Sequence, residues 1–232
     1  MDDWRMINNK VGELTEGARL GVPIVFGYIP VAIAFGLVCR DAGIAPHVAL
    51  LFSALVFAGA SQFMAVEMIS LGAGPVQIVA ATLALNSRHL LMSSSIASRV
   101  ASPVVAFGIT DEVFAVAAAR PGTLTPRTVL GIEAMAYAAW CGGTLLGALA
   151  GDVLPPLIQQ ALGVTLYALF VSLLTPQLAR NAGVVVAAAV AVALRLLLGA
   201  GGLPAGVTLL LAIAGGASAG GVITLRQERV QA

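Results

Sequence analysis

Residues Leu20–Cys39 read LGVPIVFGYIPVAIAFGLVC, twenty residues without a charged side chain. About 20 consecutive apolar residues form a helix long enough to cross the ~30 Å hydrocarbon core of a bilayer. Comparable apolar runs follow along the rest of the chain. This stretch therefore predicts a membrane-spanning helix, and it predicts the same class of structure for the segments after it.

The composition supports that class over all 232 residues. Of these residues 59% are hydrophobic and 10% are charged, and the mean hydropathy is +0.98. A soluble domain carries about 25% charged residues, so a soluble fold of this chain would lack polar side chains to cover its surface. The net charge of +1 gives no basic field to attract nucleic acid. We expect an all-α, polytopic integral membrane helix bundle with seven or eight transmembrane helices, forming one transmembrane domain over residues 1–232.

Eight apolar segments are candidate spans, and two of them are short. Val104–Ala119 and Gly183–Leu198 have sixteen residues each, which rise only about 24 Å as a helix and so fall short of the bilayer core. The eight segments are Leu20–Cys39, Val48–Leu71, Val76–Ala97, Val104–Ala119, Val129–Ala150, Leu154–Leu174, Gly183–Leu198 and Leu203–Leu225.

The distribution of Lys and Arg predicts the orientation. With eight crossings, eight cations lie on one side and only Arg40 and Arg99 on the other, while Arg88 and Arg195 lie within spans. Cytoplasmic loops carry the excess of cations, so both termini are predicted to be cytoplasmic, with a short cytoplasmic segment over residues 1–19. If Val104–Ala119 does not cross, three cations lie on the N-terminal side and seven on the other, and the N-terminus is predicted to be external. This charge difference is smaller than that of the eight-crossing arrangement.

Glycine and proline suggest how the helices pack and bend. Gly143, Gly147 and Gly151 recur every four residues, which clears one helix face for a close neighbour. Pro23 and Pro30 lie within the first span, where each removes a helical hydrogen bond and predicts a kink. Such a kink can line a cavity or merely bend a packing helix.

An internal repeat is also possible. The segments 79–91 and 186–198 share alanine, arginine and leucine at the same spacing. Strings rich in alanine, valine and leucine also match one another by chance, so both interpretations stay open.

Charged and polar residues inside the apolar segments are candidate site residues. An ionisable group at mid-bilayer costs at least about 2.5–3.5 kcal/mol and therefore marks a function by default. Arg88 lies deep in its segment, next to Asn86 and His89. Its guanidinium suits a substrate carboxylate, bound by two parallel hydrogen bonds, or a structural pair with Glu67, the nearest acid in the sequence. His89 can relay protons or be a satisfied core histidine.

Two further clusters lie in apolar segments. Gly59, Ser61 and Gln62 combine close backbone approach with hydrogen-bonding side chains, which suits a polar ligand or a contact between helices. Asp111 and Glu112 are adjacent, about 100° apart on a helix, and we expect one to pair with an arginine while the other faces water. Glu133 lies near the start of its segment and is expected to reach the membrane interface.

The sequence contains few patterns that are typical of enzymes. Residues 216–220 match the G-x-S-x-G pattern of a serine nucleophile, but they lie in a Gly/Ala-rich apolar segment instead of a strand-to-helix turn. An intramembrane serine protease therefore stays a remote alternative. The sequence has no GxxxxGK[ST], HExxH or CxxC pattern, so we expect no cofactor and no metal.

The spaced motifs along the first half of the chain resemble the AzlC family of branched-chain amino-acid permeases. Trp140 with Gly142-Gly143-Thr144 is similar to the family's next span, whereas Ala32 stands where the family pattern suggests a glycine. The motifs are Gly21-x-Pro23-x-x-x-Gly27-x-x-Pro30-x-x-x-x-Phe35-Gly36, then Phe57–Phe63, Asn86-x-Arg88-His89 and Thr110-Asp111-Glu112-x-Phe114.

The resemblance implies a non-enzymatic exporter of leucine, isoleucine, valine and sometimes methionine, located in the cytoplasmic membrane and driven by an ion or proton gradient. It also implies a small AzlD-type membrane subunit, which we expect to pack on the Gly143/Gly147/Gly151 face or on another glycine face. Arg88, an acid and small apolar walls would complement the carboxylate, ammonium and side chain of an amino acid. The alternative is an accessory or scaffold membrane protein whose buried charges are structural.

Overall fold

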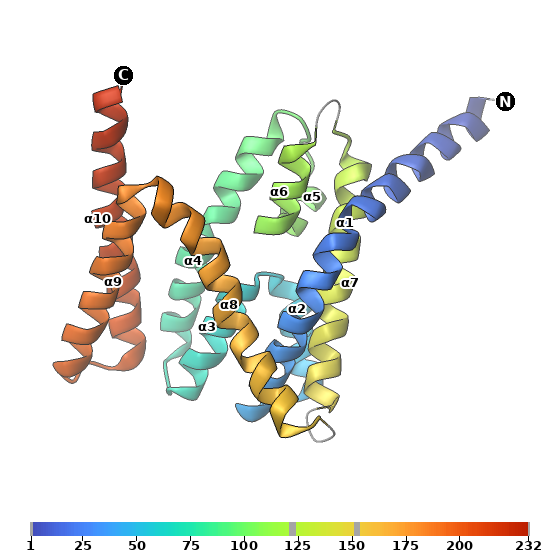
Figure 1. The fold of residues 1–232 in the computed structure, drawn as a ribbon. Coiled ribbons are helices and arrows are strands. Elements are labelled where there is room, and N and C mark those ends of the chain that lie inside the picture. The colour runs from blue at the N-terminus through green and yellow to red at the C-terminus, as the bar shows by residue number, and fades with distance from the viewer. Residues whose placement is uncertain (1, 121–123, 151–153, 232) are drawn as a thin grey trace. The chain divides into compact units, whose positions relative to one another are not determined.

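The computed structural model describes residues 2–120, 124–150 and 154–231, and within these ranges it has ten helices and no strands (Figure 1). The predicted all-α fold class is confirmed. The helices are α1 Asp2–Asp41, α2 Pro46–Val56, α3 Gly59–Ser70, α4 Pro75–Ala97, α5 Pro103–Gly108, α6 Asp111–Ala119, α7 Pro126–Ala150, α8 Pro156–Arg180, α9 Ala182–Ala200 and α10 Ala205–Gln231.

Proline and glycine set many of the helix boundaries. Helices α2, α4, α5, α7 and α8 each begin at a proline, which suits the first turn because that turn has no helical acceptor for the missing N–H. Helices α1, α3 and α9 are followed by Gly43, Gly72 and Gly202, with φ of 74°, 72° and 77°. Glycine adopts this left-handed conformation without a Cβ clash and so ends the helix.

Helix α1 continues through both of its prolines. Pro23 and Pro30 leave the carbonyls of Arg19 and Phe26 without their helical donor, yet the helix runs unbroken from Asp2 to Asp41. Residues 2–19, part of the segment expected to precede the first span, therefore begin this helix. A kink at either proline stays a prediction.

The segment predicted as the span Val48–Leu71 folds back on itself. Helix α2 ends at Phe57, whose φ of 43° and ψ of 45° are left-handed, and α3 starts two residues later. Gln62 Nε2 donates to Ser53 Oγ at 3.1 Å across the break. Phe35 of α1 meets both arms, with ring centroids 6.0 Å from Phe52 and 5.1 Å from Phe63. We call α2 and α3 the first hairpin, with its tip at residues 57–58.

The predicted span Val104–Ala119 folds back in the same way. Helices α5 and α6 are separated by Ile109 and Thr110, both in extended conformation. Arg99, before α5, donates to the carbonyl oxygen of Arg120, after α6, at 3.0 Å. The two ends of this segment therefore lie together. We call α5 and α6 the second hairpin, with its tip at residues 109–110.

These two reversals divide two of the eight predicted spans into pairs of helices with 11 and 12 residues and with 6 and 9 residues. None of these four helices has the length of a bilayer-spanning helix, and the number of crossings stays a prediction. An apolar run shows that a segment prefers lipid or a protein core, but it does not show that the helix is continuous. By length and composition, four helices in the described ranges can cross a membrane: Lys10–Asp41, Pro126–Ala150, Ala182–Ala200 and Val207–Gln227. Helices α4 and α8, with 23 and 25 residues, also have the necessary length.

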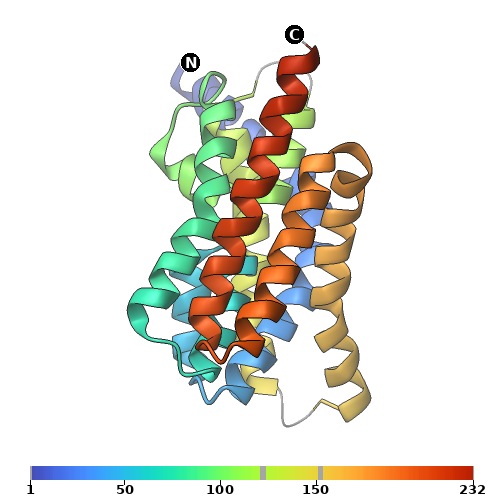
Figure 2. The same cartoon turned by 90° about the vertical axis from the view of Figure 1, so that its left-hand side faces the viewer.

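The chain divides into two compact units, Met1–Phe63 with Ala84–Gly163 and Met64–Leu83 with Val164–Ala232. In the second unit, α9 and α10 lie side by side (Figure 2). Gly183 and Gly220 bring their backbones together, and Arg195 Nη1 donates to Thr208 Oγ1 at 2.8 Å. The proposed repeat of residues 79–91 in 186–198 stays a prediction.

Candidate functional site

Helices α1 and α7 form the frame of the first unit and pack through glycines along their length. A Cβ atom at Gly143 would lie 2.6 Å from the Cβ of Ala32, and one at Gly147 would meet the carbonyl oxygen of Ile33. The expected glycine face thus holds α1 of the same chain, so it is not open to a partner subunit. Gly151, the third residue of the predicted face, lies outside the described residues.

The tip of the first hairpin is organised by the side-chain amide of Gln62, which is fully buried. Its Oε1 accepts from Trp140 Nε1 at 3.0 Å and from the backbone N–H of Ala58 at 3.2 Å. Its Nε2 donates to Ser53, whose hydroxyl lies 2.8 Å from that of Thr144. This network satisfies polar groups that would be costly to bury alone, and it holds the tip against α7.

The other candidate residues of this tip, Gly59 and Ser61, have local roles in this conformation. The Ser61 hydroxyl donates to the carbonyl oxygen of Ala58 at 2.9 Å. A Cβ at Gly59 would lie 2.7 Å from Cη2 of Trp140, so glycine makes room for the indole. Two predicted substrate residues, Gly59 and Gln62, therefore contact one buried tryptophan.

The tip of the second hairpin carries Thr110, Asp111 and Glu112. The Thr110 side chain caps α6 by accepting from the Val113 backbone N–H at 3.4 Å. The hydroxyl of Tyr28 hydrogen-bonds with Glu112 Oε2 at 2.6 Å and with Thr110 Oγ1 at 2.7 Å. Helix α1 thereby holds this tip by one tyrosine.

Tyr28 also links the two tips. Its ring meets Trp140 edge to face, with centroids 5.4 Å apart and an interplanar angle of 71°. Trp140 bonds to Gln62 of the first tip, and Tyr28 bonds to Glu112 of the second. Figure 1 shows α2 beside the C-terminal half of α1, and α5 and α6 beside the start of α7. The candidate site is this junction.

Arg88 adds a cation to the second tip. Its Nη1 lies 2.9 Å from Asp111 Oδ2, with the two side chains 35% and 30% exposed. Its Nε is buried and has no hydrogen-bond partner among the described residues, and the same holds for Asn86 Oδ1. His89 is half-buried. These two buried polar atoms without partners can form hydrogen bonds with a ligand.

The remaining predicted acid, Glu67, is exposed on α3 and falls in the second unit. The acid paired with Arg88 is Asp111, and Glu112 bonds to Tyr28. The two adjacent acids thus have different partners, which their angular separation on the helix allows.

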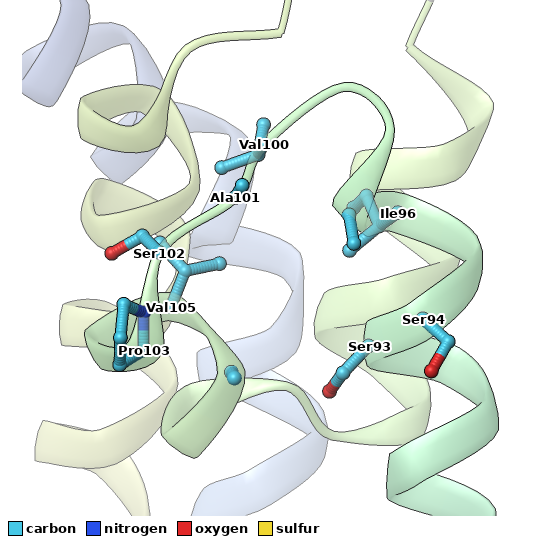
Figure 3. Close-up of a pocket in the computed structure, with 10 residues that line it drawn as sticks. Ser93, Ser94, Ile96, Val100, Ala101, Ser102, Pro103 and Val105 are labelled. Atoms are coloured by element: carbon cyan, nitrogen blue, oxygen red, sulfur yellow. The ribbon is translucent and has the colours of Figure 1, made fainter.

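A hollow of about 400 Å³ lies where α4 ends and α5 begins (Figure 3). It is lined by Ser93, Ser94 and Ser102 together with apolar residues such as Ile96 and Val105. None of the predicted substrate residues lines it. The hollow is therefore distinct from the junction of the tips.

Sequence reasoning missed or misjudged several residues of the junction. Tyr28 has no charge and lies in an apolar run, and Ser53 and Thr144 are ordinary small polar residues in such runs. Glu133 was expected at the membrane interface but is 6% exposed, packed against Gly108. The position of a residue near the end of a helix predicts exposure only when no other element covers that residue. Helix α5 covers Glu133.

The G-x-S-x-G pattern lies within the continuous helix α10. Gly216 and Gly220 pack on α9, and Ser218 is exposed. The strand-to-helix turn that exposes a nucleophilic serine is not formed there.

Comparison with known proteins places these features in context. A family model described as AzlC protein matches residues 23–154. That range contains both hairpins and all of α7. No solved structure matches the chain.

Individual relatives are membrane proteins. The chain is 36% identical to the inner membrane protein YgaZ of Escherichia coli over 193 residues, 77% of this chain and 79% of the relative. It is 39% identical to an uncharacterized membrane protein of Archaeoglobus fulgidus, covering 73% of this chain and 78% of the relative. It is 26% identical to the branched-chain amino acid transport protein AzlC of Bacillus subtilis, over 41% of this chain and 39% of the relative.

Proposed function

Because the chain belongs to the AzlC family, we propose that it is a secondary transporter that exports branched-chain amino acids across the cytoplasmic membrane. Leucine, isoleucine and valine are the proposed substrates, with methionine as a further one. The export is coupled to an ion or proton gradient and uses a small AzlD-type membrane subunit. Helix α1 covers the Gly143 and Gly147 face, so we place that subunit on another face of the protein.

The observation that carries this proposal is the meeting of two interrupted segments at the Tyr28–Trp140 contact. Secondary transporters bind their substrates where discontinuous helices end near the bilayer midplane. A long helix followed by a hairpin occurs twice here, as α1 with the first hairpin and α4 with the second. Helix α2 of the first hairpin and the end of the second hairpin contact α1 towards its opposite ends, which suits an inverted repeat.

The junction offers complementary groups for a zwitterion. The free Nε of Arg88 can donate to a substrate carboxylate, and Asp111 or Glu112 can accept from its ammonium. The aromatic residues Tyr28, Phe57 and Trp140 supply apolar surface for the side chain. Pairing both charges limits the cost of bringing the substrate into a low-dielectric site.

The hairpins also sharpen the proposed orientation. If neither hairpin crosses, Arg99 joins the side that holds the N-terminus, and only Arg40 remains on the opposite side. A bias of nine against one supports cytoplasmic termini more strongly than eight against two. The nine cations are Arg5, Lys10, Arg19, Arg99, Arg120, Arg127, Arg180, Arg226 and Arg229.

Ligand-dependent stability tests the proposal against a scaffold role. A ligand that binds only the folded state raises its stability, by about 2.7 kcal/mol at one hundred times Kd. We expect the unfolding temperature of the purified protein to rise with leucine and to stay unchanged with lysine. An unfolding temperature that stays the same with leucine, isoleucine and valine would support the scaffold role.

A further inference from the structure

A buried carboxyl group lies against the second hairpin next to its tip. Glu133 of α7 is 6% exposed, and it faces Gly108, the last residue of α5. A Cβ atom at residue 108 would lie 2.5 Å from Oε2 and 2.7 Å from Cγ of Glu133. The absence of a side chain at residue 108 therefore makes the space that the carboxyl occupies.

Nothing in the described part of the chain neutralises this carboxyl. Glu133 Oε1 is buried and has no hydrogen-bond partner, and no lysine, arginine or histidine forms an ion pair with it there. A buried carboxylate without a cation or donors is costly, whereas the neutral acid fits such a site much better.

The ionisable groups on the surrounding elements are already engaged or exposed. Helix α5 has none. On α1, α6 and α7 they include Glu13 paired with Arg127, Glu16 paired with Arg120, Arg19, which is exposed, Tyr28 bonded to Glu112, Asp111 paired with Arg88, and Tyr137, which donates to the Ala54 carbonyl oxygen.

We propose that Glu133 is the proton-binding site of the transport cycle. This inference rests on the proposed transport function and deepens it by naming the coupling ion and its site. The carboxylate takes a proton on one oxygen before α5 covers it, and the acid returns that proton to water when Gly108 moves away. A proton needs one oxygen, whereas a metal ion needs several ligands.

The experiment uses purified protein in liposomes with a pH indicator in the lumen. We expect leucine flux in either direction through the wild type to be accompanied by a proton flux that the indicator reports. Glu133→Gln keeps the size of the side chain but cannot exchange a proton. We expect this variant to lose accumulation driven by a pH gradient, down to the level of empty liposomes, and to keep leucine–leucine exchange at equal pH.

Asp41→Asn is the matched control, because Asp41 is an exposed acid at the end of α1. It should keep both activities. The inference is overturned if leucine flux through the wild type is not accompanied by proton flux. It is also overturned if a sodium gradient alone drives leucine accumulation. Both outcomes hold for any result with Glu133→Gln. Gradient-driven accumulation by Glu133→Gln at the wild-type rate also overturns it. If the wild type catalyses no leucine exchange at all, the proposed function itself fails.

Discussion

The guanidinium of Arg88 lies 2.9 Å from the carboxylate of Asp111, and this ion pair joins the middle of α4 to the first residue of α6. It holds the second hairpin from one side, while Tyr28 holds it from α1. The two residues are separated by the α4–α5 loop and by α5, so the pair fixes the hairpin to the helix that precedes it. A stronger Arg88–Asp111 ion pair therefore makes movement of the second hairpin away from α4 less favourable.

Substitutions of Arg88 distinguish substrate binding from a structural pair. Arg88→Lys keeps the charge but cannot form two parallel hydrogen bonds with a carboxylate, so we expect it to fold and to lose most leucine transport. Arg88→Ala should destabilise the protein by about 1–2 kcal/mol. This is less than the roughly 3–5 kcal/mol of a fully buried pair, because both side chains are about one-third exposed. The measurements are unfolding temperature and leucine exchange in liposomes.

The matched variants for that test concern the acid. Asp111→Asn combined with Arg88→Ala should recover much of the lost stability without recovering transport. An Arg88→Lys protein that transports leucine at the wild-type rate would leave Arg88 with a structural role alone.

Tyr28→Phe tests whether the second tip is held by its hydrogen bonds. The variant keeps the ring that meets Trp140 but removes the hydroxyl that bonds to Glu112 and Thr110. We expect a loss of about 1–3 kcal/mol, because a charged acceptor loses its donor. Hydrogen exchange of α6 amides should accelerate, while that of α9 amides should not change. Unchanged exchange in α6 would show that the hydroxyl does not hold the tip.

The α1–α7 contact predicts a strong dependence on glycine size. Gly147→Leu would push a side chain into the Ile33 carbonyl oxygen, so we expect loss of the folded protein in detergent. Gly142→Ala on the same helix faces open space and should leave the unfolding temperature unchanged or slightly higher. Size-exclusion chromatography and thermal unfolding report both. A well-folded Gly147→Leu protein would contradict the close helix approach.

The position of the α4–α5 loop distinguishes six crossings from eight. We expect a cysteine introduced at Ser98 to be cytoplasmic, and one at Asp41 to be external. In spheroplasts, a membrane-impermeant maleimide should therefore label Asp41→Cys and spare Ser98→Cys until the membrane is opened. Labelling of both in intact spheroplasts would restore the eight-crossing arrangement.

The sequence predicted where helices lie better than it predicted where they turn back. Each of the eight apolar segments is mostly helical in the structure, because apolar content and flanking prolines and glycines are local signals. The reversals at Phe57 and Ile109–Thr110 depend on tertiary contacts that no local pattern encodes. A left-handed phenylalanine is an uncommon conformation that only the surrounding packing makes acceptable.

The same limit applies to the candidate site. Arg88, Asp111 and Glu112 were predictable because charges in apolar segments are rare and costly. The tyrosine that holds Glu112 was not, since Tyr28 is 84 residues from Glu112 in the sequence and acts through a neutral hydroxyl. Glu133 looked interfacial from its place near the start of a segment, and only the contact with Gly108 reveals its burial.

Leucine counterflow into liposomes is the decisive measurement for the proposed transport function. The protein is reconstituted alone and together with a small AzlD-type subunit, the vesicles are loaded with unlabelled leucine, and entry of labelled leucine is followed at equal pH on both sides. We expect transient accumulation of the label, suppressed by external isoleucine or valine and unaffected by lysine. Label that never exceeds the level of empty liposomes in either preparation would refute leucine transport by this protein.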